Sequence, residues 1–253
     1  MGDLLPAVAL GVGKTANAIV TGDAHTCVRL TDGSVKCWGY NLYGQLGLGD
    51  GTNRGSLAAA MGDTLPTVKL GMGKTAKILA AGAYHTCAVL NDDALKCWGF
   101  NTYGQLGAGD TTTRGLAAVQ MGDSLLPVAL GTGKTAKAVT AGDGHTCALL
   151  SDDGIKCWGR NADGQLGLGD TANRGNGVGK MGDDLPLVAL GAGTTQKAVV
   201  AGDFHNCALS SNGAVKCWGK NANGQLGLGD AATRGDGVGK MGDDLPLVSL
   251  SAP

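Results

Sequence analysis

The chain has 253 residues, of which 46 are glycine and 16% are charged, and its formal net charge is −1. A near-neutral chain offers no cluster of Lys and Arg for nucleic acid, and no apolar run reaches the 18 residues of a membrane helix. The composition therefore predicts no binding of nucleic acid and no membrane insertion, and the high glycine content favours short strands joined by tight turns.

The tripeptide Met-Gly-Asp recurs at a fixed spacing of 60 residues, without insertions or deletions. Its copies begin at Met1, Met61, Met121, Met181 and Met241. A long, constant period indicates stacked supersecondary units. We divide the chain into repeats at 1–60, 61–120, 121–180 and 181–240, followed by the first segment of a fifth repeat at 241–253. Because Met1 occupies a repeat position, we expect the chain to be a segment of a longer protein.

Within each repeat the apolar residues alternate with a period of two, which is typical of β-strands. In the third repeat this pattern predicts four short strands, at residues 126–130, 137–141, 146–150 and 155–158. The glycine-rich segment 164–170 would be a poor helix. We predict an all-β fold of four propeller-type blades, each with about four short antiparallel strands.

The hairpin in the middle of each repeat carries a clear turn signal. In the first repeat, Thr31-Asp32-Gly33 separates two strands, and a three-residue loop favours Gly, Asn or Asp at its last, left-handed position. The four repeats have Gly33, Asp93, Asp153 and Gly213 at this position. A loop of this length pairs Leu30 with Ser34 and places Cys27 opposite Cys37.

The same register places all eight cysteines in directly opposed pairs, and opposed β-carbons lie near the distance that a disulfide needs. We predict disulfides joining Cys27 to Cys37, Cys87 to Cys97, Cys147 to Cys157, and Cys207 to Cys217. Locally paired cysteines favour an oxidising compartment, so an extracellular or cell-surface location is expected. Two alternatives stay open: buried free thiols, and a zinc site in which His145, Cys147 and Cys157 supply three ligands.

One histidine and one tryptophan also recur in every repeat. They are His25, His85, His145, His205, Trp38, Trp98, Trp158 and Trp218. No Ser and carboxylate recur beside the histidines in a constant catalytic arrangement, so we expect hydrogen-bonded structural histidines, with metal binding or pH sensing as the alternatives. The tryptophans face away from the cysteines and are expected to pack between blades, with ligand contact as the alternative.

Residues 142–167 read Gly-Asp-Gly-His-Thr-Cys-Ala-Leu-Leu-Ser-Asp-Asp-Gly-Ile-Lys-Cys-Trp-Gly-Arg-Asn-Ala-Asp-Gly-Gln-Leu-Gly. This stretch resembles the repeat of the regulator of chromosome condensation family, and the match recurs in all four repeats. The resemblance implies one β-propeller blade per repeat, commonly seven in a closed ring. It does not imply one activity, because the family includes exchange factors, a plant UV-B photoreceptor and a secreted β-lactamase inhibitor.

The photoreceptor's Gly-Trp-Arg-His-Thr motif is absent, since the chain reads Gly-Asp-Ala-His-Thr at Gly22 and Gly-Asp-Gly-His-Thr at Gly142. The Cys-Trp-Gly form of the repeat is similar instead to repeats of secreted bacterial and algal proteins. The repeats differ most at residues 55–60, 115–120, 175–180 and 235–240 and at the loop tips 42–43, 102–103, 162–163 and 222–223. Such variable loops on a rigid scaffold are candidate binding surfaces.

We predict a non-catalytic, extracellular structural or adhesive repeat protein that assembles head to tail into an array or filament. Its expected partners are other proteins or copies of itself, and no cofactor, metal or small-molecule substrate is expected. The alternative is a propeller-type module that binds or inhibits one protein, with Tyr43, Tyr84 and Tyr103 as anchors.

The number of Met-Gly-Asp segments bears on the shape of the molecule. A closed ring of four blades needs four such segments, whereas the chain has five, so one copy is surplus. We therefore predict an open arc with residues 1–12 and 241–250 at opposite ends, where each end expects a neighbour, either from the same parent chain or from another copy joined head to tail.

Overall fold

The computed structural model describes residues 4–250, which form four separate antiparallel sheets of three strands each. The strands of the first two sheets are β1 (Ala16–Thr21), β2 (His25–Leu30), β3 (Val35–Gly39), β4 (Ala76–Ala81), β5 (His85–Leu90) and β6 (Leu95–Gly99). Those of the last two are β7 (Ala136–Ala141), β8 (His145–Leu150), β9 (Ile155–Gly159), β10 (Gln196–Ala201), β11 (His205–Ser210) and β12 (Val215–Gly219). The prediction of an all-β fold is confirmed.

Short 3₁₀ helices interrupt the connections between sheets. They are η2 (Ala58–Ala60), η3 (Gly62–Thr64), η4 (Ala118–Gln120), η5 (Gly122–Ser124), η6 (Gly182–Asp184) and η7 (Gly242–Asp244). Within residues 4–250, no helix has the length and hydropathy needed to cross a membrane.

The predicted hairpin turn is confirmed in all four sheets. The Leu30 amide donates to the Ser34 carbonyl at 2.8 Å, and Cys27 lies opposite Cys37 in the register of β2 and β3. The last loop residue is left-handed in every repeat, with φ of 78° at Gly33 and 65° at Asp153. The short polar side chain of Asp tolerates this conformation, which explains why the turn survives without glycine in two repeats.

The prediction of four strands per repeat is wrong, because the first of the four predicted segments forms no strand. In the third repeat residues 126–130 form no strand, and the segment donates one backbone hydrogen bond to a sheet, from the Val128 amide to the Leu95 carbonyl at 2.7 Å. Pro127 has no amide proton, so regular pairing cannot continue through it. Because Leu95 belongs to β6, this segment completes the sheet of the preceding repeat, not that of its own.

The same offset occurs along the whole chain and identifies the surplus segment. The Val68 amide donates to the Val35 carbonyl, and the Val248 amide donates to the Val215 carbonyl at 2.9 Å, so residues 241–250 complete the fourth sheet. The first copy is the one without a sheet to complete: Leu5 is 65% exposed, whereas its counterpart Leu65 is 1% exposed.

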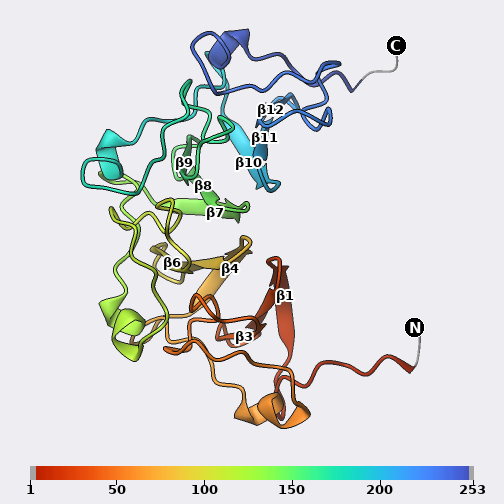
Figure 1. Cartoon of the computed structure of the whole chain (residues 1–253), viewed down its shortest axis with the longest axis vertical. Helices are drawn as coiled ribbons and strands as arrows, with labels where there is room; N and C mark the ends of the chain where they lie inside the picture. Colours follow the sequence, from red (N-terminus) through yellow and green to blue (C-terminus); the bar gives the residue numbers. More distant parts are fainter. Residues whose placement is uncertain (1–3, 251–253) are drawn as a thin grey trace.

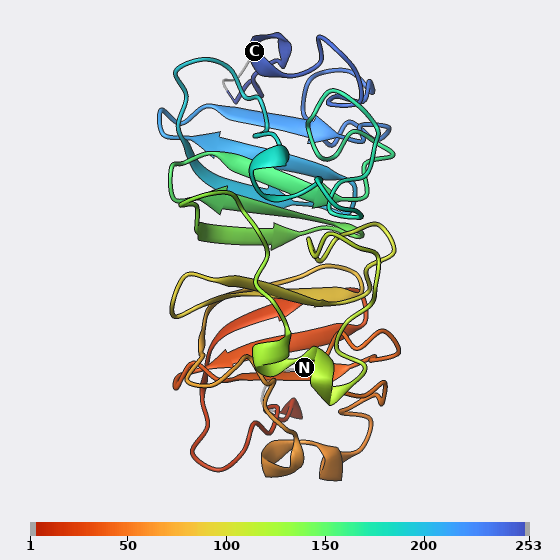
Figure 2. The same ribbon diagram turned by 90° about the vertical axis from the view of Figure 1, so that its left-hand side faces the viewer.

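The four sheets follow one another around an open arc, as predicted (Figure 1). The strands β1, β4, β7 and β10 lie on the concave side, while the long connections and 3₁₀ helices lie on the convex side. Seen at 90° to this view, the sheets are stacked one above another (Figure 2). Residues 4–12 and 241–250 lie at opposite ends of the arc; residues 1–3 of the predicted terminal segment fall outside the described residues.

The hydrophobic core lies between consecutive sheets. Between the first two sheets, Cys27 and Val35 pack with Leu79, Leu90 and Trp98, and each of these side chains is at most 7% exposed. Equivalent clusters fill the next two joints. Full burial of one large apolar side chain contributes about 1.5–3 kcal/mol, so each sheet depends on its neighbours for most of its hydrophobic stabilisation.

Glycines allow the sheets to approach closely on the concave side. A β-carbon added to Gly82 would lie 2.3 Å from the Gly142 carbonyl oxygen, and one added to Gly142 would lie 2.5 Å from the Gly202 carbonyl oxygen. These positions therefore require a residue without a side chain, because the opposing atom is backbone and cannot rotate away.

We predict that Gly82→Ala lowers the free energy of unfolding by about 1–3 kcal/mol, because the methyl group would push the second and third sheets apart. Gly177→Ala is the matched control: a β-carbon there meets nothing closer than 3.9 Å, so its effect should stay below about 1 kcal/mol. Chemical denaturation of the three proteins measures the difference. Equal stability of Gly82→Ala and the parent protein would contradict this account of the joint.

Candidate binding face

Each sheet has one disulfide, which joins its central strand to its third strand. The disulfides link Cys27 to Cys37, Cys87 to Cys97, Cys147 to Cys157, and Cys207 to Cys217. The first three pairs lie in the cores between sheets, with exposures of 0–2%. The described residues contain no free cysteine and no cluster of three or more His, Cys, Asp or Glu suited to a metal. The thiolates that the zinc and free-thiol alternatives require are thus engaged in sulfur–sulfur bonds.

The recurring histidine links each sheet to the next through a short chain of hydrogen bonds. Between the first two sheets, His25 Nε2 lies 2.9 Å from Thr86 Oγ1. Thr86 Oγ1 in turn donates to the backbone carbonyl oxygen of Gln45 at 2.9 Å. The single hydroxyl proton of Thr86 is used in that second bond, so His25 Nε2 must carry the proton that it donates to Thr86. This contact fixes the tautomer of the ring.

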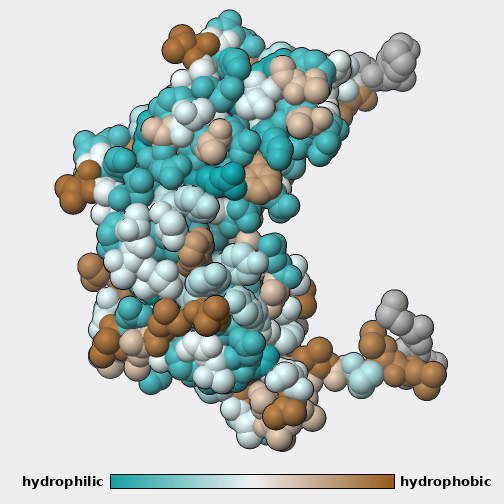
Figure 3. All heavy atoms as spheres, in the orientation of Figure 1, coloured by the Kyte–Doolittle hydropathy of each residue, from teal (hydrophilic) through white to brown (hydrophobic). Residues whose placement is uncertain are grey.

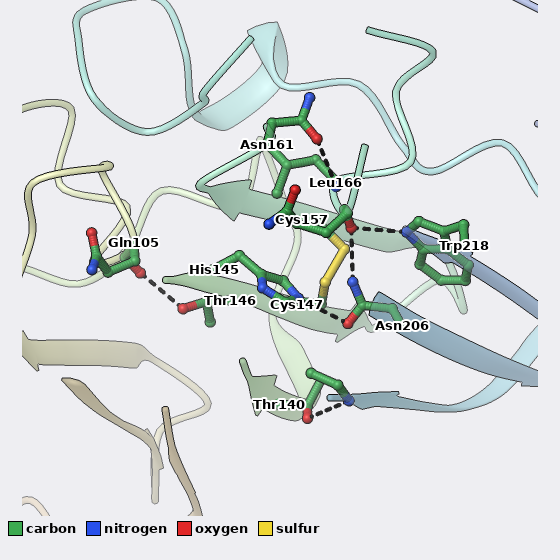
Figure 4. The surroundings of a disulfide bond; sticks show 12 residues. Gln105, Thr140, His145, Thr146, Cys147, Cys157, Asn161, Leu166, Asn206 and Trp218 are labelled. Atoms are coloured by element: carbon green, nitrogen blue, oxygen red, sulfur yellow. Dashed lines mark hydrogen bonds between the residues drawn. A yellow bond between two sulfur atoms is a disulfide. The ribbon is translucent and has the colours of Figure 1, made fainter. Parts of the chain in front are cut away.

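The third joint preserves this relay with a different residue (Figure 4). Asn206 accepts from His145 Nε2 at 3.2 Å through its carbonyl oxygen and donates to the Gln165 carbonyl at 2.7 Å through its amide nitrogen. A side-chain amide combines an acceptor with a donor, as a hydroxyl group does. The change of His-Thr to His-Asn in the fourth repeat therefore leaves the connection between the sheets intact.

The recurring tryptophan binds the same carbonyl oxygen. Trp98, Trp158 and Trp218 are fully buried, and the indole Nε1 of Trp218 donates to the Gln165 carbonyl at 2.9 Å. Equivalent bonds join Trp98 to Gln45 and Trp158 to Gln105, each at 3.0 Å. The structure thus brings the predicted His and Trp side chains together at each joint, where they touch neighbouring sheets. Their structural role remains our proposal.

Burial holds these histidines in the neutral form. It lowers the pKa of His25 and His145 to about 4 and that of His85 to about 3, from an ordinary value of 6.5. The Nδ1 atoms of these rings are buried without a hydrogen-bond partner, so an added proton would have nothing to bind. At the exposed end of the arc, His205 is partly buried, and desolvation lowers its pKa as well.

Two further polar contacts recur, both at loops. Arg54 and Asp50 form an ion pair at 2.7 Å, and the equivalent pairs form in the other three repeats at 2.6–2.7 Å. The second contact, made by Lys96, was not predicted from the sequence. Lys96 lies in β6 and is 5% exposed, and its Nζ donates to the backbone carbonyls of Leu70 and Gly122. It anchors the Met-Gly-Asp turn to the sheet, and its only sequence signal is a lysine at a core-facing strand position in every repeat.

One row of aromatic and cationic side chains crosses all four repeats. We define the aromatic–cation row as Tyr40, Tyr43, Tyr84, Phe100, Tyr103, Arg160, Phe204 and Lys220. All are partly buried, and the row contains every tyrosine and phenylalanine of the chain. The row is the most distinctive surface of the molecule, because no other part of the described surface gathers side chains of this kind.

Contacts within the row run from each repeat to the next. The Tyr43 ring lies 5.4 Å from that of Tyr84 and 4.8 Å from that of Phe100, measured between centroids. Farther along, the Arg160 guanidinium lies 5.8 Å from the Tyr103 ring and 4.8 Å from the Phe204 ring. The row thus changes from purely aromatic in the first two repeats to mixed aromatic and cationic in the last two.

The sequence predicted part of this row. It singled out Tyr43, Tyr84 and Tyr103 but missed most of their partners, because contacts such as those of Tyr43 with Tyr84 and Phe100 form only when consecutive sheets stack. The variable segments 55–60, 115–120, 175–180 and 235–240 lie elsewhere, in the long connections on the convex side, where Val119 and Val178 are 78% and 99% exposed (Figure 1).

The concave side of the arc is hollow (Figure 3). A cavity of about 440 Å³ is lined there by the ends of β1, β4, β7 and β10 and by Asp23 and Asp203. Burial raises the pKa of nearby Asp143, and the charges of Asp23 and Asp203 raise it further. Aspartates without an assembled nucleophile or base give this hollow no evident chemistry, so the aromatic–cation row is the better candidate for recognition.

Comparisons with known proteins agree on the repeat and the fold. The profile described as "Regulator of chromosome condensation (RCC1) repeat" matches residues 32–89, 93–149 and 155–209, and a second profile with this description matches residues 17–45, 77–105, 136–165 and 196–225. The ultraviolet-B receptor UVR8 of Arabidopsis thaliana is 31% identical over 220 residues, which is 85% of this chain and 44% of that protein. The chain thus spans less than half the length of this relative.

Two solved structures share the fold. Human WBSCR16 superposes with a TM-score of 0.72 at 18% identity, over 94% of this chain and 54% of that one. Yeast RCC1 (Prp20), in its complex with Kap60, superposes with a TM-score of 0.68 at 20% identity, over 96% of this chain and 50% of that one. At these identities the likeness shows the fold, which is that of a β-propeller, and this chain covers about half of each of the two structures.

The buried histidines predict a specific dependence of stability on pH. The unfolded chain takes up protons near pH 6.5, whereas the folded chain resists them down to about pH 4, so stability should be full above pH 6.5 and fall as the pH drops toward 4. Between pH 6.5 and 4.5 the loss should be at most roughly 3 kcal/mol for each interior histidine. Denaturant unfolding at pH 7.5, 6.5, 5.5 and 4.5 measures it.

His145→Gln provides the control, because the Gln amide can donate to Asn206 but does not titrate. This variant should show a smaller loss of stability between pH 6.5 and 4.5 than the parent protein. An unchanged slope would mean that the interior histidines do not account for the effect.

Proposed function

Because the chain belongs to the family of proteins built from regulator of chromosome condensation (RCC1) repeats, we propose that it is a non-catalytic, extracellular module that binds other proteins. In residues 4–250 the recurring histidines form no arrangement of nucleophile and base, and His25, His85 and His145 each use Nε2 to bind the next sheet. What varies from repeat to repeat is the surface that the scaffold presents.

The aromatic–cation row is the observation that carries this proposal. Tryptophan, tyrosine and arginine dominate the residues that contribute most to protein–protein affinity. Tyrosine offers a large contact area and a polar group at a small cost in conformational entropy. In the row, Tyr43 and Tyr84 are held by neighbouring rings, and Arg160 is held by Tyr103 and Phe204. Such preorganised side chains lose little freedom when a partner binds.

The relatives support a protein partner. Yeast RCC1 (Prp20), which has the same fold, was solved bound to the protein Kap60. That partner is not transferred to this chain, because likeness at 20% identity concerns the fold. What supports the proposal is that a propeller of this type offers a surface to which another protein binds.

The disulfides support the extracellular location. Each of the four sheets has one, and buried cysteines would remain reduced in a cytosolic compartment. An oxidising environment outside the cytosol is the setting in which all four bonds persist.

A second candidate function is the structural array, in which copies join head to tail. The observation that favours it lies at the two ends of the arc, where side chains that are buried at every internal joint are exposed. Ile19 of β1 is 65% exposed, for example, whereas its counterpart Leu79 of β4 is 7% exposed.

Variants of the row test the first proposal. We expect Tyr43→Ala and Tyr84→Ala to weaken binding to a partner protein, captured as described below, by roughly tenfold to a hundredfold. Each substitution removes an anchor and the ring contacts that hold neighbouring side chains in place. Val119→Ala, an exposed residue of η4 outside the row, is the matched control and should bind as the parent does. The measurement is quantitative mass spectrometry after cross-linking to the native extracellular fraction, followed by titration of the recovered partner. Equal capture by all four proteins would contradict a role for the row.

The state of the cysteines tests the location. Intact protein recovered from the extracellular fraction should carry four disulfides, so complete reduction should add the mass of eight hydrogen atoms. Mass spectrometry of the native and the reduced chain measures the difference, with alkylation before reduction to detect thiols that were free at the outset. Eight alkylated cysteines before reduction would contradict the proposed compartment.

A further inference from the structure

The aromatic–cation row already holds one cation of its own, inside the arc, and the surroundings of that cation show what the row can recognise. The Arg160 guanidinium lies 4.8 Å from the centroid of the Phe204 ring and 5.8 Å from that of the Tyr103 ring. Two carboxylates flank it, Asp143 at 3.5 Å and Asp163 at 3.7 Å. Aromatic rings attract a cation through their negative faces, and carboxylates attract it through their charge. This arrangement therefore suits a guanidinium or ammonium group.

The rings of the first two repeats hold no such cation. Tyr40, Tyr43 and Tyr84 contact one another edge to face, with centroids 5.4–6.1 Å apart. Phe100 takes the repeat position of Arg160 and lies 4.8 Å from the Tyr43 ring. Within residues 4–250, no Lys or Arg lies over any of these four rings. Since the rings are partly exposed, a cation from another molecule can pack on them.

The charge beside the row is predominantly negative. Asp23, Asp143 and Asp203 share one repeat position, and Arg160 is the only cation of the described chain that pairs with any of them. Burial raises the pKa of Asp143, and the charges of Asp23 and Asp203 raise it further, so Arg160 does not offset the group. The other cation of the row is Lys220, which lies over the Phe204 ring. A partner with positive charge would relieve this repulsion.

We propose that the row binds a basic segment of another protein, whose lysine or arginine side chains pack on the tyrosine rings and pair with the aspartates beside them. This inference rests on the protein-binding function proposed above and specifies the chemistry of the partner. The aliphatic stems of lysine and arginine can cover ring surface while their charged groups reach a carboxylate, as Arg160 does within this chain.

An acidic segment fits this surface less well. Arg160 is already shared by the carboxylates of Asp143 and Asp163, and the aspartates at the rim of the concave cavity, Asp23 and Asp203, would repel further negative charge. Charge complementarity therefore favours a basic partner.

The test uses three synthetic peptides that share one sequence of Gly, Ser and Leu and differ at four positions, which are Arg, Gln or Glu. Each is titrated against the oxidised full-length chain by calorimetry. The Arg peptide should bind roughly tenfold more tightly than the Gln peptide, and the Glu peptide more weakly than both. Added salt should weaken binding of the Arg peptide, because it screens exposed ion pairs.

Arg160→Gln is the most specific variant. It frees two rings and two carboxylates for the peptide, so the Arg peptide should bind roughly threefold to tenfold more tightly than it binds the parent protein. An acidic partner would instead lose affinity. Lys197→Gln changes the net charge equally and is the matched control: Lys197 is exposed, near the start of β10, whereas Asp203 follows the end of that strand. It should alter binding by less than about twofold.

Two further variants separate the ring from the charge. Tyr84→Leu keeps an apolar side chain but removes the ring, so it should weaken the Arg peptide roughly fivefold and leave the Gln peptide unchanged. Asp143→Asn removes one carboxylate and should weaken the Arg peptide to a similar degree. Asp184→Asn, at an exposed residue of η6 on the convex side, is its control and should bind as the parent does. Thermal unfolding checks that each variant is folded.

The inference would be overturned by equal binding of the three peptides, by no binding of the Arg peptide, by a preference for the Glu peptide, or by weaker binding to Arg160→Gln. A preference for the Glu peptide would leave the row a protein-binding surface with the opposite choice of charge. The proposed function itself fails only if the Tyr43→Ala and Tyr84→Ala variants capture a native partner as well as the parent does.

Discussion

The joint between consecutive sheets is the contact on which this molecule depends. An isolated three-stranded sheet of this kind would expose two apolar faces to water, and stacking buries them at the three joints. At each joint a carbonyl oxygen of Gln accepts from a tryptophan and from a hydroxyl or amide, which in turn accepts from a histidine. Because every donor in this relay is buried, loss of one member would leave others unpaired. Asn206 can replace threonine because its side chain offers both an acceptor and a donor.

The joint also separates two tasks within each repeat. The residues that face neighbouring sheets are nearly constant, whereas the aromatic–cation row occupies positions that differ from repeat to repeat. Tyr40, Phe100, Arg160 and Lys220 stand at one repeat position, immediately after the constant Trp-Gly pair. The scaffold therefore fixes where these side chains stand, and substitution can change what they recognise without disturbing the core.

Much of the fold was predictable because its signals are local. Turn residues such as Gly33 and Asp93 and the spacing of Cys27 and Cys37 determine one hairpin, and the repeat multiplies it. The error at residues 126–130 has a physical cause: an apolar alternating segment resembles a strand, yet Pro127 limits it to one hydrogen bond with a sheet of the previous repeat. Only part of the aromatic–cation row was predicted, because contacts between repeats, such as that of Tyr43 with Tyr84, form only when consecutive sheets stack. Lys96 was missed because a buried lysine that binds carbonyl oxygens has no motif of its own.

The offset between the sequence repeat and the sheet determines how the chain can gain or lose repeats. Since each sheet is completed by the first segment of the repeat that follows, loss or duplication of any whole repeat would leave every remaining sheet with a completing segment. Such a change would alter the length of the arc without damaging a remaining joint. The number of repeats can therefore change while each remaining sheet keeps the segment that completes it.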